Sequence, residues 1–181
     1  GLPTERLQGL FVTHFHSDHI AEIYEVNLGS WVSGRPAPLT VYGPRGVDEV
    51  IGAINAVYRM ERMYRTRHHG LDLLPPNLGV LHHKTIAPGV IFADADLTIT
   101  AYVAEHPPVV PAVGYRFDYR GRSVVISGDS NVNGDTLDIV NGADLLLHDA
   151  LSLSTVSSLS AALSDAGRPR QSKVVGDVID Y

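Results

Sequence analysis

The segment His14-Phe15-His16-Ser17-Asp18-His19 places four potential metal ligands within six positions of this 181-residue chain. It directly follows an apolar run, Leu7–Thr13, whose composition predicts a buried strand. Side chains alternate along a strand, so the first two histidines can face one point where the strand ends. A turn after the strand lets Asp18 and His19 face a second point nearby. The spacing therefore favours two adjacent metal ions over a chance cluster of surface histidines in a loop.

The chemistry of these ligands narrows the choice of metal. Imidazole and carboxylate groups without sulfur suit zinc, manganese or iron. The chain has nine histidines and no cysteine, which excludes disulfide frameworks, thiolate zinc sites and cysteine nucleophiles. We expect two divalent ions, with zinc first and manganese or iron as alternatives.

Composition and charge limit the classes of partner. Apolar residues make up 44% and charged residues 19%, which is typical of a folded domain with a core. The net charge of −6 gives no general attraction to nucleic acid, so RNA binding would need a local basic patch. No apolar run is long enough for a membrane span, so we expect no membrane partner. A cytoplasmic location is expected, and the sequence leaves export open because it begins at Gly1 without Met.

Hydrophobic periodicity predicts a mixed α/β fold. Helices are expected from Asp18 onward, with Ser17 or Asp18 as N-cap, and from Val47 to about Tyr64. Arg120-Gly121-Arg122 predicts a hairpin turn, and the proline- and glycine-rich stretch 70–89 predicts a loop. Segment 151–166 is ambiguous between helix and loop, and 173–181 predicts the start of one more element. Further strands are expected over 39–42, 90–92, 97–104, 113–119, 123–126 and 143–147, the last of them buried.

The first motif resembles the His-x-His-x-Asp-His signature of the metallo-β-lactamase fold superfamily. Later segments extend the resemblance, in the expected order, to the branch that contains the tRNA 3′-processing endonucleases and related arylsulfatases. They are Ala104-Glu105-His106 followed by Gly114-Tyr115-Arg116, then Ile126-Ser127-Gly128-Asp129-Ser130, and Leu146-Leu147-His148-Asp149-Ala150. The resemblance implies an αββα sandwich, that is, an α/β (α+β) fold of mixed sheets flanked by helices.

The resemblance also implies roles for individual residues. Catalytic roles would fall to Asp18 and to His148, which matches the histidine implicated as general acid for the leaving group. The two metals would hold a hydroxide nucleophile and polarise the substrate oxygen. A structural histidine at a strand end remains the alternative for position 148. One metal would take His14, His16, His106 and Asp129, and the other would take Asp18, His19 and Asp129.

Two departures from the family pattern bear on domain organisation. Family members begin with strands before the first motif, which here starts at position 14. In family members, the last metal-ligand histidine comes after the motif that matches Leu146–Ala150. Asp177–Tyr181 resembles the approach to that histidine. We therefore expect residues 1–181 to be the central portion of a single metallo-β-lactamase-like hydrolase domain, without its N-terminal strands and C-terminal segment. The missing ligand is expected beyond Tyr181.

Three hypotheses for function follow. The first is a binuclear metal-dependent hydrolase that cleaves a phosphodiester or a similar ester, such as an aryl sulfate, in a small anionic substrate. The second is a tRNA 3′-processing endoribonuclease, which we place lower because only one hairpin separates His106 from Asp129 and leaves no room for a long basic arm. The third is a fold relative that binds a metal or a partner without catalysis. A homodimer is an open alternative to a monomer.

Other polar clusters have less specific interpretations. The pairs His68-His69 and His82-His83 are expected to have a solvated or loop role, with a substrate-pocket or lid role as the alternative. The arginines between Arg59 and Arg67 are expected on a solvated helix face, with a clamp for an anionic substrate as the alternative. Gly128 is expected to serve backbone shape beside Asp129, and Trp31 is expected in the core.

Overall fold

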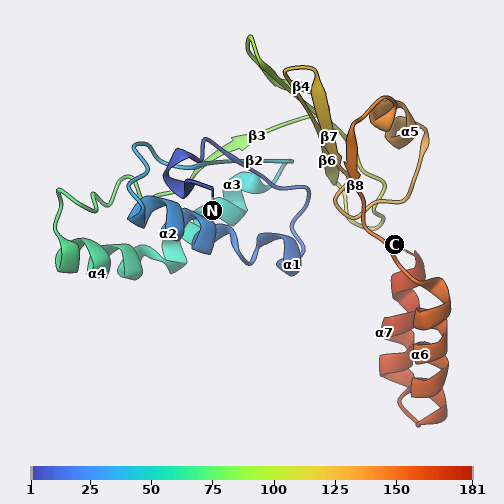
Figure 1. The fold of residues 1–181 in the computed structure, drawn as a ribbon. Helices are drawn as coiled ribbons and strands as arrows, with labels where there is room; N and C mark the ends of the chain where they lie inside the picture. The colour runs from blue at the N-terminus through green and yellow to red at the C-terminus, as the bar shows by residue number, and fades with distance from the viewer. Residues whose placement is uncertain (1, 181) are drawn as a thin grey trace. The chain divides into compact units, whose positions relative to one another are not determined.

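The computed structural model describes residues 2–180, and the chain divides into two compact units, Gly1–Ile91 and Phe92–Tyr181. Each unit has its own sheet and its own helices (Figure 1). This mixed α/β composition, with two sheets flanked by helices, confirms the expected fold class. No helix within residues 2–180 combines the length and the apolar character needed to cross a membrane.

Unit 1 is built on a three-stranded parallel sheet in the order β1-β2-β3. Parallel pairing requires crossover connections, and helices supply them here. The strands are β1 (Leu10–Phe11), β2 (Thr40–Gly43) and β3 (His82–Thr85), and the helices are η1 (Thr4–Arg6), α1 (Ser17–Ile20), α2 (Ile23–Val32), α3 (Val47–Val57) and α4 (Arg59–His69).

The core of unit 1 joins the strands to the helices that follow them. Its fully or nearly fully buried members lie in or directly beside the strands, in α2, and one turn apart in α3. They are Val12, Ile23, Leu39, Val41, Val47, Ile51 and Leu81. Trp31 is 1% exposed, as its core assignment predicts.

The periodic segment from Val47 onward forms two helices rather than one. The helices meet at Tyr58, whose φ of −93° and ψ of 13° leave the helical region. The Tyr58 ring stacks on Tyr24, with 3.5 Å between ring centroids and 3° between the planes. Hydrophobic periodicity continues through the junction, so the pattern alone does not reveal the break.

Unit 2 is built on a five-stranded sheet in the order β4-β5-β6-β7-β8. β5, β6 and β7 are antiparallel neighbours, and β8 runs parallel to β7. The strands are β4 (Gly89–Ala93), which begins in unit 1, β5 (Leu97–Val103), β6 (Val113–Tyr119), β7 (Arg122–Ile126) and β8 (Leu145–Leu147). The helices are α5 (Gly134–Val140), α6 (Leu153–Asp165), α7 (Pro169–Asp177) and η2 (Val178–Asp180).

The expected hairpin between β6 and β7 is confirmed. Its two turn residues, Arg120 and Gly121, have φ values of 49° and 76°. Two successive left-handed residues match the twist of antiparallel strands, which is why this turn type is common in hairpins. The Arg120 guanidinium also forms an ion pair at 2.8 Å with Asp96, which lies in the turn between β4 and β5.

Three further expectations about the elements were wrong. Stretch 70–89 is not all loop, because β3 lies within it as an exposed, polar edge strand. Segment 143–147 is not buried: the three residues of β8 are 43–53% exposed, and within residues 2–180 β8 has a partner strand on one side only. The strand expected over 7–13 is reduced to β1. Segment 151–166 resolves as helix, and the element expected near residue 173 begins at Pro169; Tyr181 lies outside the described residues.

Candidate metal centre

Unit 1 contributes the first group of ligands, at the end of β1. Val12 still donates a backbone hydrogen bond to Tyr42 in β2, at 2.9 Å, so the chain leaves the sheet only as it reaches His14. The His14 side chain is fully buried, and its Nε2 lies 3.0 Å from Nδ1 of His16. The other ring nitrogen of His14 lies 3.1 Å from the Thr13 hydroxyl. A ligand histidine held by its second nitrogen in this way is typical of metal sites.

Asp18 and His19 follow within the single turn of α1. The expected N-cap at Ser17 or Asp18 was wrong, because His16 occupies that position and makes no side-chain cap. The Asp18 carboxylate lies 3.3 Å from Nε2 of His19. The turn thus brings together the carboxylate and the imidazole that the sequence assigns to the second metal.

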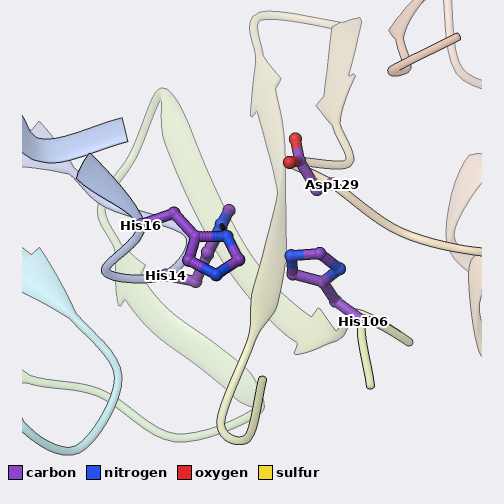
Figure 2. Close-up of side chains that lie close together, drawn as sticks. All are labelled: His14, His16, His106 and Asp129. Carbon is purple, nitrogen blue, oxygen red and sulfur yellow. Dashed lines mark hydrogen bonds between the residues drawn. The ribbon is translucent and has the colours of Figure 1, made fainter. Parts of the chain in front are cut away.

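Unit 2 contributes His106 and Asp129, from the segments that follow β5 and β7. Two hydrogen bonds tie these segments together: the Glu105 N–H donates to the Ser130 side-chain Oγ at 3.0 Å, and the Asn131 N–H donates to the Glu105 carbonyl at 2.8 Å. Ligand atoms of His106 and Asp129 lie within 4.8 Å of each other. Figure 2 draws these two side chains together with those of His14 and His16.

The backbone around Asp129 has the shape that the sequence predicts. Gly128 has a φ of 64°, a left-handed conformation that side chains disfavour. The preceding Ser127 donates its backbone N–H to the Leu147 carbonyl in β8, at 3.0 Å, so the chain departs from the sheet at the glycine. The Ser130 hydroxyl accepts from Glu105 and donates to the Asn131 carbonyl at 2.8 Å. These two hydrogen bonds give the hydroxyl a structural role.

His148 follows β8, as expected, and contacts an acidic neighbour. Its Nδ1 lies 3.0 Å from an Asp149 carboxylate oxygen and 2.8 Å from the Asp149 carbonyl. The same carboxylate oxygen accepts the Ser130 N–H at 3.3 Å. The opposite nitrogen, Nε2, is buried and has no hydrogen-bond partner within residues 2–180. Sequence reasoning did not assign Asp149 an orienting role, although its place next to His148 in the motif was the available signal.

The donor set fits divalent metal ions. In each unit, imidazoles and carboxylates lie close together without sulfur, which suits zinc, manganese or iron. Asp129 offers two oxygens, so one carboxylate can serve two ions. The metal itself is not identified by this chemistry.

Comparison with known proteins identifies the family. Residues 2–167 match the family model described as a beta-lactamase superfamily domain. The protein named ribonuclease Z of Mycobacterium bovis (strain BCG / Pasteur 1173P2) is 36% identical over 186 residues, which cover all of this chain and 61% of that protein. A protein named putative ribonuclease Z of Mycobacterium tuberculosis (strain CDC 1551 / Oshkosh) is 37% identical over 177 residues, covering 95% of this chain and 72% of its own.

A solved structure agrees with the family in fold. The crystal structure of the short form of human tRNase Z superposes with a TM-score of 0.60 at 21% identity, covering 89% of this chain and 64% of that chain. At this identity the likeness concerns the fold alone. With the ordered motifs and the family match, it leads to one conclusion: the chain belongs to the beta-lactamase superfamily, in its metallo-β-lactamase fold.

Proposed function

We propose that this chain forms the core of a ribonuclease Z-type endoribonuclease that hydrolyses a phosphodiester bond in the 3′ extension of a tRNA precursor. The observation that carries the proposal is the similarity, at 36–37% identity over 95–100% of this chain, to proteins named ribonuclease Z and putative ribonuclease Z. The chain spans only 61% of the length of the Mycobacterium bovis relative, so the activity is proposed for the protein of which these residues are part.

This proposal reverses the order of our first two hypotheses. The small-ester hypothesis ranked first because no long arm separates His106 from Asp129. However, an alignment of 186 positions that covers all 181 residues leaves room for only a few inserted residues in the relative. A short spacing therefore does not distinguish this chain from a protein named ribonuclease Z. The net charge of −6 does not distinguish it either, because RNA binding depends on local charge.

We propose that the two groups of ligands form one binuclear site. His14, His16, His106 and Asp129 would hold one ion, and Asp18, His19 and Asp129 would hold the other, with zinc as the expected metal. Bound ions would supply Lewis-acid activation of water and of the scissile phosphate. The protein's own contribution is to converge these side chains from strand ends and to keep His14 oriented through Thr13.

Leaving-group protonation is assigned to His148. Its Nδ1 side is occupied by Asp149, which fixes the orientation of the ring. The proton to be transferred therefore resides on Nε2, the nitrogen without a protein partner. It passes to the departing ribose oxygen, and the imidazole regains a proton from water.

The decisive experiment is cleavage of a tRNA precursor that carries a 3′ trailer, compared with hydrolysis of bis(p-nitrophenyl) phosphate and p-nitrophenyl sulfate. We expect cleavage of the precursor by the intact protein, and loss of that activity in Asp129→Asn. Asp135→Asn, which removes an exposed carboxylate from α5, is the matched control and should retain activity. Turnover of a nitrophenyl ester without precursor cleavage would restore the small-ester hypothesis. Metal binding without turnover of any substrate would favour a non-catalytic relative.

A further inference from the structure

A second candidate site lies on α4 in unit 1, and none of the proposed metal ligands lines it. It is a pocket of about 380 Å³, within the size range of small-ligand sites. The side chains that matter here are three arginines and three apolar residues: Arg59, Arg62, Arg67, Met63, Pro76 and Val80. The pocket thus combines positive charge with apolar walls.

Arg62 is the strongest sign that the pocket takes a negative ligand. Its side chain is only 7% exposed, and Nη2 donates to the Asn55 carbonyl at 2.9 Å. Nη1 is buried without a hydrogen-bond partner, and Arg62 forms no ion pair within residues 2–180. Buried charges in proteins are normally paired, because an isolated buried charge is costly. An anion in the adjoining pocket would supply the missing counter-charge.

Arg59 and Arg67 provide accessible donors at the same pocket. Both are exposed, and neither forms an ion pair among the residues that the structure describes. The one acidic residue of α4, Glu61, is committed elsewhere, because its carboxylate accepts the Tyr24 hydroxyl at 2.9 Å and pairs with Arg65. The Glu61 carboxylate therefore pairs with Arg65, which does not line the pocket, and leaves the pocket arginines able to pair with a ligand.

We propose that this pocket binds a nucleotide. The exposed guanidinium groups of Arg59 and Arg67 match a phosphate group, for which arginine provides paired donors. The apolar lining offers a contact surface for the planar base. Arg62 contributes through its positive charge and not through a direct hydrogen bond, because its unpartnered Nη1 is buried in the wall of the pocket. The nucleotide is either a free molecule or one unit of an RNA strand.

The test is binding of adenosine 5′-monophosphate by isothermal titration calorimetry to the intact protein in EDTA. The chelator prevents phosphate from binding through metals, so the result is independent of the proposed endonuclease. Adenosine, inorganic phosphate and a six-nucleotide adenylate RNA are titrated in parallel. The variant is Arg59→Gln/Arg67→Gln, and the matched control is Arg6→Gln/Arg45→Gln, which removes two exposed arginines of unit 1 that do not line the pocket.

We expect adenosine 5′-monophosphate to bind at least tenfold more tightly than adenosine or inorganic phosphate. Binding should weaken at least tenfold in the pocket variant and change less than twofold in the control. Tighter binding of the RNA than of the monophosphate would assign the site to a strand, and the reverse would assign it to a free nucleotide. Equal affinity of the pocket variant and the wild type, or equal affinity for phosphate alone, would overturn the proposal.

Discussion

His148 is the residue to which the proposed function gives the general-acid role; one of its ring nitrogens contacts Asp149 and the other has no hydrogen-bond partner within residues 2–180. A general acid matters only when the leaving group needs a proton. We expect His148→Ala to lower the rate at least about 100-fold for a substrate with an alkoxide leaving group. The loss should be less than about 10-fold for a nitrophenolate leaving group, which departs without protonation.

The measurement is steady-state kinetics of the two substrates with wild type and variant. His83→Ala is the control, since it removes an exposed imidazole of β3 that has no place in the proposed site. An equal loss for both substrates would assign His148 to structure or metal positioning instead.

Among single elements, the β5–β6 pair carries the tightest steric constraint. Gly114 faces Tyr102 across the two strands, and a Cβ at position 114 would lie 2.3 Å from the Tyr102 ring. The Tyr102 ring is buried, so it has little room to move. We expect Gly114→Ala to lower the free energy of unfolding by about 1–3 kcal/mol through overpacking.

Urea denaturation of a double-mutant cycle checks this origin. In a Tyr102→Ala background, the added methyl group should cost far less, because the ring that it would strike is gone. Gly52→Ala in α3, where nothing lies within 4 Å of the new Cβ, should instead stabilise by about 0.5–1 kcal/mol. Additive effects of Gly114→Ala and Tyr102→Ala would rule out the clash.

The β7–β8 connection depends on the charge of Asp144. A hydrogen bond from Arg122, followed by one from the Ser123 backbone N–H, lowers the pKa of Asp144 below its ordinary value. A carboxylate whose pKa is depressed in the folded state contributes stability above its unfolded pKa, near 4, and loses it as pH falls through the folded value. The contribution of Asp144 should therefore be complete at neutral pH and vanish in acid.

Thermal melts of Asp144→Asn against wild type, from pH 7 to pH 2.5, measure this dependence. The variant should melt lower at pH 7, and the two curves should converge at the acidic end. Asp138→Asn, an exposed substitution on α5, provides the comparison. A gap between Asp144→Asn and wild type that stays constant across this range would contradict the assignment.

Sequence patterns predicted the elements that carry their own signal and missed those that depend on neighbours. The β6–β7 hairpin was predictable because its turn residues are specific to that geometry. β3 was not, since a polar His-His-Lys-Thr segment pairs only because β2 lies beside it. The apolar β8 was predictable as a strand but not as an exposed one, because an apolar run does not state its position in the sheet.

The candidate site shows the same contrast between residues that a sequence pattern identifies and contacts that depend on the fold. The metal-ligand candidates could be named because the order of the motifs resembles that of the metallo-β-lactamase fold superfamily. The hydrogen bonds that support them, such as Glu105 to Ser130 and His14 to Thr13, join residues in ways that spacing does not encode. The assembly of the ligands from both units into one site stays a prediction.

For the whole molecule, that prediction has a thermodynamic consequence. A metal that binds ligands from both units stabilises the folded chain over the unfolded one, by about 2.7 kcal/mol when its concentration is 100 times the dissociation constant. For a chain of this size we expect zinc to raise the melting temperature of the EDTA-treated protein by about 5 °C or more. Differential scanning calorimetry tests this, and Asp129→Asn should abolish most of the rise. A full rise in that variant would remove Asp129 from the site.

The contrast between the two sheets also sets the order in which they can form during synthesis. β6 and β7 are joined by a two-residue turn, so they can pair within microseconds of leaving the ribosome. β1 must wait for the distant β2, and the parallel sheet is complete only when Thr85 has emerged. The half of the chain that is made first is therefore the slower to close. The apolar residues of β1 and β2 remain open to chaperones, or to neighbouring nascent chains, until then.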